Sequence, residues 1–182
     1  MREITKIIIH CSATPPDMDV GVAEIRHWHT DPPPKGNGWN DIGYHFVIRR
    51  DGRFERGRPV EIQGAHCAAQ NGNKASIGIC MVGGVRRGLH PKTGNPALLV
   101  ENNFTHSQWL TLEQQVELLQ IRFPKIDTIL GHRDLDPGKE CPSFSVRDWL
   151  RRQALARPVW PDFSNVVSEV TSTEEMVERP AP

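Results

Sequence analysis

The chain has 182 residues, of which 37% are hydrophobic, and its 22 basic and 22 acidic side chains leave a formal net charge of zero. This length can bury one sizeable core, so a single domain is expected. The balanced charge argues against general attraction to nucleic acid or to an anionic membrane. It conceals an acidic end, because five carboxylates lie between Asp162 and Glu178.

The first predicted element is a buried strand over residues 6–10, where β-branched residues lead into a polar segment. Its apolar run is much shorter than a signal sequence or a membrane span requires. We therefore expect no membrane insertion, no signal peptide and synthesis in the cytoplasm. In that compartment the four cysteines are expected to be reduced.

A helix is expected over residues 22–29, because apolar residues recur there at helical spacing and the prolines that follow cannot continue it. The Pro- and Gly-rich residues 32–38 are expected to form an exposed loop. Residues 44–48 and 53–56 flank an Asp-Gly pair and predict a β-hairpin, because Asp-Gly suits a turn that needs positive φ.

Residues 76–82 predict a further buried strand. Residues 86–103 are polar, with two prolines and two glycines, and are expected to form a long loop. A helix is then expected over residues 105–122, where Thr105 and Gln108 have the spacing of a capping box and the apolar residues lie on one face.

A strand over residues 126–130 and a helix that begins near Ser145 complete the ordered part. The sequence thus predicts an α/β (α+β) fold, with a central mixed β-sheet flanked by helices, as a single domain over residues 1–160. Residues 161–182 lack apolar periodicity and are expected to form an acidic, disordered tail.

Three residues that can bind a metal ion fall at or just beyond predicted strand ends. His10 closes the first strand, His132 follows the strand at 126–130, and Cys141 lies in the loop after it. Loops at the ends of strands are where catalytic groups gather, and two histidines with one cysteine are an accepted ligand set for catalytic zinc. Spacing alone leaves the ordinary interpretation open, in which the histidines are core or surface residues and Cys141 is a plain loop thiol.

Four segments occur in an order that is typical of one known family. They are Ile8–Thr14, Trp39–Ile48, Ser76–Gly84 and Gly131–Phe144. Together, over about residues 4–155, they closely resemble the zinc-dependent N-acetylmuramoyl-L-alanine amidases. This family includes the amidase-type phage lysozymes and the peptidoglycan recognition proteins.

The resemblance implies hydrolysis of the amide bond between N-acetylmuramic acid and L-alanine in bacterial peptidoglycan. It further implies a bacteriolytic phage or prophage endolysin, made in the host cytoplasm and acting on the cell wall after the membrane is permeabilised. One Zn²⁺ per chain is expected, with His10, His132 and Cys141 as its ligands. Peptidoglycan is the expected partner, nucleic acid is not, and the chain is expected to be a monomer.

The resemblance also assigns roles to other residues. Tyr44 and Lys139 match positions that assist catalysis in the phage branch, where Lys139 would stabilise the developing oxyanion and Tyr44 would hydrogen-bond water or substrate. Trp39, His66 and Asn73 are candidate substrate-binding residues. Taken alone, Lys139 would be read as a solvated loop lysine and Tyr44 as a strand residue that packs on the sheet.

Strand alternation separates neighbours of these residues from the site. Successive side chains on a strand face opposite ways. If Tyr44 faces the substrate groove, His45 is therefore expected on the other face of the sheet. By the same argument, Cys11 points away from His10 and is expected to be a core residue.

Three other functions remain open at this point. A peptidoglycan-binding module without activity is one, although binding-only members of the family commonly lack the cysteine that is present here as Cys141. An added inhibitory contact with an RNA polymerase is another, and no short motif can reveal it. The third is a cysteine hydrolase with Cys141 as nucleophile and His132 as base.

Overall fold

The structure, a computed structural model, describes residues 2–156. Among the described residues, those up to Trp149 form one compact unit, and residues 150–156 belong to another. The predicted tail over residues 161–182 lies outside the described residues and stays a prediction. Among the described residues, no helix has the length and apolar character needed to cross a membrane.

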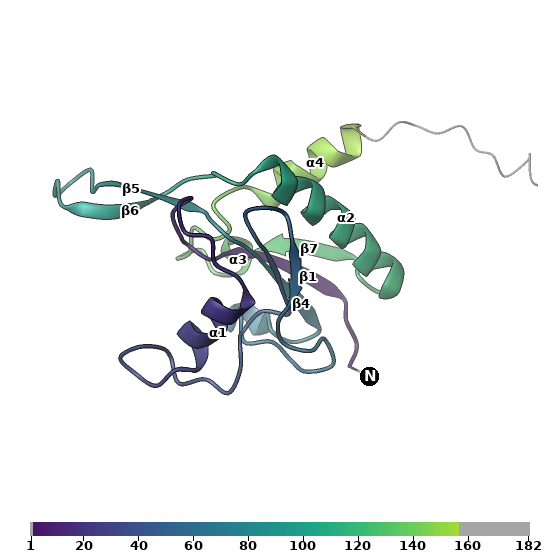
Figure 1. Ribbon diagram of the computed structural model, residues 1–182. Helices are drawn as coiled ribbons and strands as arrows, with labels where there is room; N and C mark the ends of the chain where they lie inside the picture. Colours follow the sequence, from purple (N-terminus) through teal and green to yellow (C-terminus); the bar gives the residue numbers. More distant parts are fainter. Residues whose placement is uncertain (1, 157–182) are drawn as a thin grey trace, which may run out of the picture. The chain divides into compact units, whose positions relative to one another are not determined.

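The first unit is built on a mixed five-stranded sheet with the strand order β3-β2-β4-β1-β7 (Figure 1). Its strands are β1 (Lys6–Cys11), β2 (Phe46–Ile48), β3 (Phe54–Arg56), β4 (Ser76–Met81) and β7 (Thr128–Gly131). β4 and β7 run parallel to β1 on its two sides, β2 runs parallel to β4, and only β3 is antiparallel to its neighbour. The predicted mixed sheet is confirmed.

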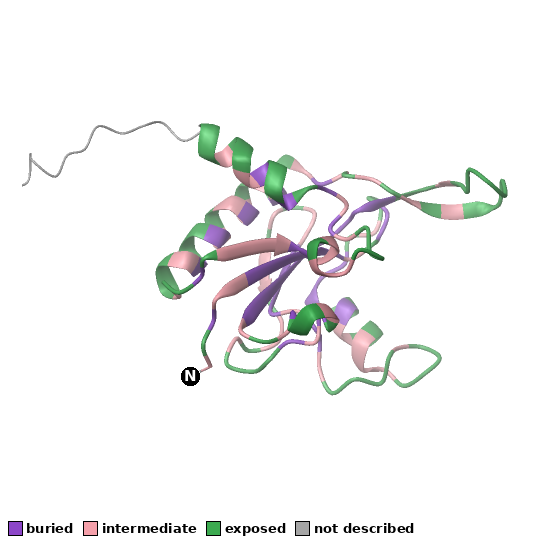
Figure 2. Cartoon of the chain, turned by 180° about the vertical axis from the view of Figure 1, so that it is seen from behind, coloured by how far each residue is buried: buried purple, intermediate pink, exposed green. Residues whose placement is uncertain are grey.

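Helices cover both faces of this sheet. α1 (Val22–Thr30) lies on one face and α2 (His106–Arg122) on the other (Figures 1 and 2). On the α1 face, Val22 and Ile25 pack against Val47 and Cys80. Because the central strands are covered on both sides, β1 and β4 read as continuous apolar runs rather than as alternating patterns.

The amino end of α2 is held by the predicted capping box. Thr105 Oγ1 accepts a hydrogen bond from the Gln108 amide at 3.2 Å, and Gln108 Oε1 accepts one from the Thr105 amide at 3.0 Å. Gln108 Nε2 also donates to the carbonyls of Ile48 and Val82, at 3.2 and 2.9 Å. The cap therefore ties the helix to the ends of β2 and β4.

The prediction of a long loop over residues 86–103 is wrong. This segment forms a two-stranded sheet of β5 (Val85–Leu89) and β6 (Pro96–Val100), which extends away from the larger sheet (Figure 1). The prolines and glycines suggested a loop, but Pro91 and Gly94 lie only in the turn between the two strands, where Gly94 has φ +69. Pro96 is the first residue of β6, a position that a strand tolerates. Both faces are largely exposed, so no apolar alternation marked the strands.

In the described part of the chain, two helices follow β7, the last strand. α3 (His132–Leu135) was not predicted and begins directly after β7. α4 (Val146–Ala156) begins as predicted after Ser145, whose Oγ accepts a hydrogen bond from the Asp148 amide at 3.2 Å.

The first prediction concerns the α2 cap. Thr105→Ala should lower the free energy of unfolding by about 1 kcal/mol, because it removes an acceptor for an orphan helix amide. Thr105→Ser keeps the hydroxyl and should stay close to the unmodified protein. Urea denaturation of the three proteins measures the difference. Equal losses in both variants would mean that the threonine methyl group, and not the cap, carries the stability.

Candidate metal centre

Parallel strand pairing brings two histidines to one edge of the sheet. β1 and β7 are neighbours, with Ile9 opposite Gly131, so that the next residue of each strand leaves at the same end. His10 is the last-but-one residue of β1 and is fully buried, whereas His132 opens α3 and is partly exposed. Their ring centroids lie 4.8 Å apart.

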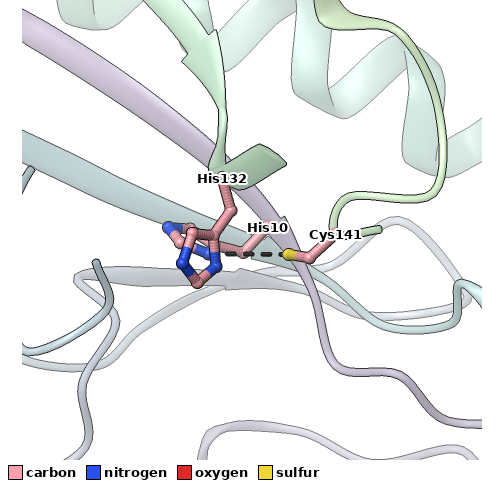
Figure 3. A group of neighbouring side chains, drawn as sticks. All are labelled: His10, His132 and Cys141. Carbon is pink, nitrogen blue, oxygen red and sulfur yellow. Dashed lines mark hydrogen bonds between the residues drawn. The ribbon is translucent and has the colours of Figure 1, made fainter. Parts of the chain in front are cut away.

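The loop after α3 returns Cys141 to these histidines. The Arg133 amide donates to the Cys141 carbonyl at 2.8 Å, and the Cys11 amide donates to Cys141 Sγ at 3.2 Å. The approach depends on Gly131, because a Cβ there would lie 2.8 Å from Pro142 Cδ. Cys141 Sγ then lies 3.6 Å from His10 Nδ1 (Figure 3).

One donor atom from each of His10, His132 and Cys141 lies within 4.8 Å of the others. Burial lowers the pKa of both imidazoles, that of His10 well below its usual value, so the rings are in the neutral form that binds metal. The hydrogen bond with the Cys11 side chain, followed by burial, raises the pKa of the Cys141 thiol, although the Cys11 backbone amide opposes this shift. A thiolate at Cys141 therefore needs a cation beside it, and this donor set fits zinc.

Cys11 is buried, as strand alternation predicted, but it is not an isolated core residue. Its side chain hydrogen-bonds with that of Cys141, and its sulfur lies 3.5 Å from Ser143 Oγ. The Cys141 loop crosses the end of β1, which brings the two thiols together. Both are free cysteines in the structure.

Tyr44 lies beside His10, with their ring centroids 5.2 Å apart. Burial, and then the neighbouring thiols of Cys80 and Cys141, raise the pKa of the Tyr44 phenol well above its usual value. The hydroxyl is therefore protonated at any working pH, and it can donate a hydrogen bond.

Lys139 is exposed and lies in the loop between α3 and Cys141. It follows a turn in which its amide donates to the Asp136 carbonyl at 3.0 Å. Burial lowers the pKa of His132, the charge of Asp136 opposes that shift, and the charge of Lys139 adds a smaller lowering, so Lys139 lies within electrostatic reach of His132.

A row of aromatic rings leads outward from the centre. From Tyr44 it continues to His29, at 5.5 Å between centroids, and from His29 to Trp39 at 4.7 Å. The Trp39 side chain is 40% exposed, whereas His29 accepts a hydrogen bond from the Gly43 amide at 3.0 Å. His29 was missed, because a histidine in the last turn of a helix carries no sequence signal that it will pack on Tyr44.

His66 and Asn73 lie behind His10 and not along this exposed row. His66 is buried, and its Nδ1 lies 3.0 Å from His10 Nε2. Asn73 Oδ1 accepts hydrogen bonds from the amides of His66 and Cys67, both at 2.8 Å. These contacts favour structural roles over the substrate contacts expected from the sequence. His45 is not one of the three donors, but the prediction that it faces the other side of the sheet is wrong, because its ring lies 5.6 Å from that of His66. Tyr44 and His45 precede β2, so strand alternation does not separate them.

Comparisons with known proteins agree with this geometry. Residues 1–144 match the family described as N-acetylmuramoyl-L-alanine amidase. The chain is 42% identical over 154 residues to the endolysin of Enterobacteria phage K11, covering 85% of this chain and 90% of that protein. It is 38% identical over 155 residues to the endolysin of Escherichia phage T7, covering 85% and 91%.

A solved structure shares the fold. N-acetylmuramoyl-L-alanine amidase LysC from Clostridium intestinale URNW superposes with a TM-score of 0.61, covering 86% of this chain and 88% of that one. At 22% sequence identity, this similarity is one of fold.

The second prediction separates a structural role of Asn73 from a substrate-binding one. Asn73→Ala leaves two backbone amides without their acceptor and should cost about 2 kcal/mol of stability. Asn73→Asp keeps an acceptor oxygen and should lose much less. Urea denaturation tests both. An alanine variant of unchanged stability but weaker binding to peptidoglycan would instead make Asn73 a substrate contact.

Proposed function

This chain belongs to the N-acetylmuramoyl-L-alanine amidase family and hydrolyses the amide bond between N-acetylmuramic acid and L-alanine in peptidoglycan, and we propose that it does so with one zinc ion held by His10, His132 and Cys141. The observation that carries the proposal is the convergence of these three donor atoms within 4.8 Å. Three protein ligands leave a fourth position for water or substrate, which is the arrangement of catalytic zinc.

The electrostatics of Cys141 support zinc over a cysteine nucleophile. A nucleophilic cysteine needs a lowered pKa, so that the thiolate is present at neutral pH. Here the hydrogen bond with the Cys11 side chain, and then burial, raise the pKa of Cys141, whereas the same hydrogen bond lowers the pKa of Cys11 to about 7. The side chain is therefore suited to a bound cation and poorly suited to attack on its own.

Zinc at this position supplies Lewis-acid activation of water and of the scissile carbonyl. In the proposal, Tyr44 donates its phenolic hydrogen to the carbonyl oxygen as negative charge develops there, because burial keeps the phenol protonated. Lys139 holds its ammonium at the open side and stabilises the same charge. Water adds to the carbonyl carbon and forms a new carbon–oxygen bond. The carbon–nitrogen bond then breaks, and the proton given up by that water passes to the amine of the stem peptide, which leaves, while the carboxylate stays on the sugar side.

We propose that the aromatic row of Tyr44, His29 and Trp39 orients the substrate beside the zinc site. Trp39 is the exposed residue of this row, and its ring packs against that of His29 with the centroids 4.7 Å apart. Aromatic faces of this kind bind apolar surface and fix the orientation of a ligand with few polar contacts. Trp39 is therefore the substrate contact that the geometry supports best.

The cell wall is where this activity takes place, and the endolysin relatives support a role in phage lysis. We propose synthesis in the host cytoplasm, with access to peptidoglycan after the membrane is permeabilised, and action as a monomer. No observation on the described residues favours a contact with an RNA polymerase.

The third prediction concerns metal content. The purified protein should bind one zinc per chain, and Cys141→Ala or His132→Ala should lower that content and abolish the release of peptides from peptidoglycan. Inductively coupled plasma mass spectrometry measures the zinc, and mass spectrometry of the digest identifies the new termini. Full zinc content and full activity in Cys141→Ala would contradict the ligand set.

The fourth prediction separates catalytic residues from metal ligands. Lys139→Met and Tyr44→Phe should keep zinc, while the rate falls by roughly 10²–10³-fold, the usual loss for one donor to a developing oxyanion. Lys125→Met is the matched control, because Lys125 is an exposed lysine paired with Glu3. If Lys139→Met and the control lowered the rate equally, the oxyanion role of Lys139 would be lost.

A further inference from the structure

A chain of hydrogen bonds runs behind His10, on the side of its ring away from Cys141. His10 Nε2 lies 3.0 Å from His66 Nδ1, and His66 Nε2 lies 3.4 Å from Ser76 Oγ. Ser76 Oγ in turn donates to the Gly72 carbonyl at 2.5 Å. All three side chains are buried, so water does not compete for these bonds.

Each link in this chain has one permitted direction. A carbonyl only accepts, so the single hydroxyl proton of Ser76 is committed to Gly72. Ser76 Oγ must then accept from His66 Nε2, which leaves a lone pair on His66 Nδ1 to accept from His10 Nε2. With its proton on Nε2, His10 presents an unprotonated Nδ1 to Cys141, 3.6 Å away.

We propose that His66, backed by Ser76, is a positioning residue that holds His10 in the tautomer and ring orientation required to bind zinc through Nδ1. The inference rests on the proposed zinc site and adds residues that do not touch the metal. Histidines that bind a metal commonly donate a hydrogen bond from their second ring N–H to a fixed acceptor. Loss of that acceptor weakens metal binding by roughly 10–100-fold.

The backbone around His66 is shaped to receive its ring. Strand register puts Ser76, Gly78 and Cys80 on the same face of the sheet as His10. Gly78 leaves the gap that the ring fills, because a Cβ there would lie 2.4 Å from His66 Cδ2, and one at Gly64 would lie 2.5 Å from the same atom.

A second buried histidine provides a matched control. The ring of His45 lies 5.6 Å from that of His66, but its Nδ1 accepts from the Gly78 amide, and its Nε2 lies 3.1 Å from the Ile62 carbonyl. It thus has similar burial without a hydrogen bond to a proposed ligand. The same substitution at both positions separates loss of packing from loss of the His10 partner.

The experiment measures zinc affinity by competition with a chromophoric chelator, using refilled apoprotein whose fold is checked by circular dichroism. His66→Leu should weaken zinc binding by roughly 10–100-fold and alter the visible absorption of the Co²⁺-substituted protein. His66→Asn places an acceptor oxygen near the position of Nδ1 and should recover part of the affinity. His45→Leu should keep both the affinity and the spectrum.

The proposal is overturned if folded His66→Leu keeps its zinc affinity and cobalt spectrum, if His45→Leu weakens binding as much, or if His66→Asn recovers nothing. Should His66→Leu fail to fold, Ser76→Ala tests the same chain with a smaller change. It must weaken zinc binding in the same direction, and unchanged affinity would count against the proposal. If the wild-type protein bound no zinc, the proposed zinc-dependent mechanism itself would be contradicted, and not only the role of His66.

Discussion

The parallel pairing of β1 with β7 is the constraint on which the site depends. Because Ile9 lies opposite Gly131, the residues that follow, His10 and His132, emerge side by side although they are far apart in the sequence. A slip of one residue would turn His10 to the other face of the sheet, and a slip of two would move it by about 6.6 Å along the strand. Either change would take its ring away from His132 and from Cys141.

Burial then sets the chemistry of the groups that this pairing assembles. Burial keeps the His10 imidazole neutral and the Tyr44 phenol protonated. At Cys141, the hydrogen bond with the Cys11 side chain and then burial disfavour a free thiolate. Buried polar groups are costly unless they are hydrogen-bonded or bind a cation. A centre that is unfavourable for isolated charges is thereby suited to one divalent ion bound by two neutral imidazoles and a thiolate.

The sequence predicted elements whose signals are local. The isoleucine run of β1, the Thr105 cap and the strand-end position of His132 can all be read within a few residues. The β5–β6 pair was missed because it has no buried face to impose an apolar alternation. The placement of His66 depends on an absent side chain at Gly78 and on strand register, neither of which a single sequence displays.

X-ray absorption at the zinc edge of the loaded protein tests the central claim most directly, because it reports which atoms surround the metal. We predict one sulfur at about 2.3 Å, from Cys141, and two imidazole nitrogens at about 2.0–2.1 Å, from His10 and His132, with a light atom in the fourth position. A coordination shell of nitrogen and oxygen atoms without sulfur would contradict it.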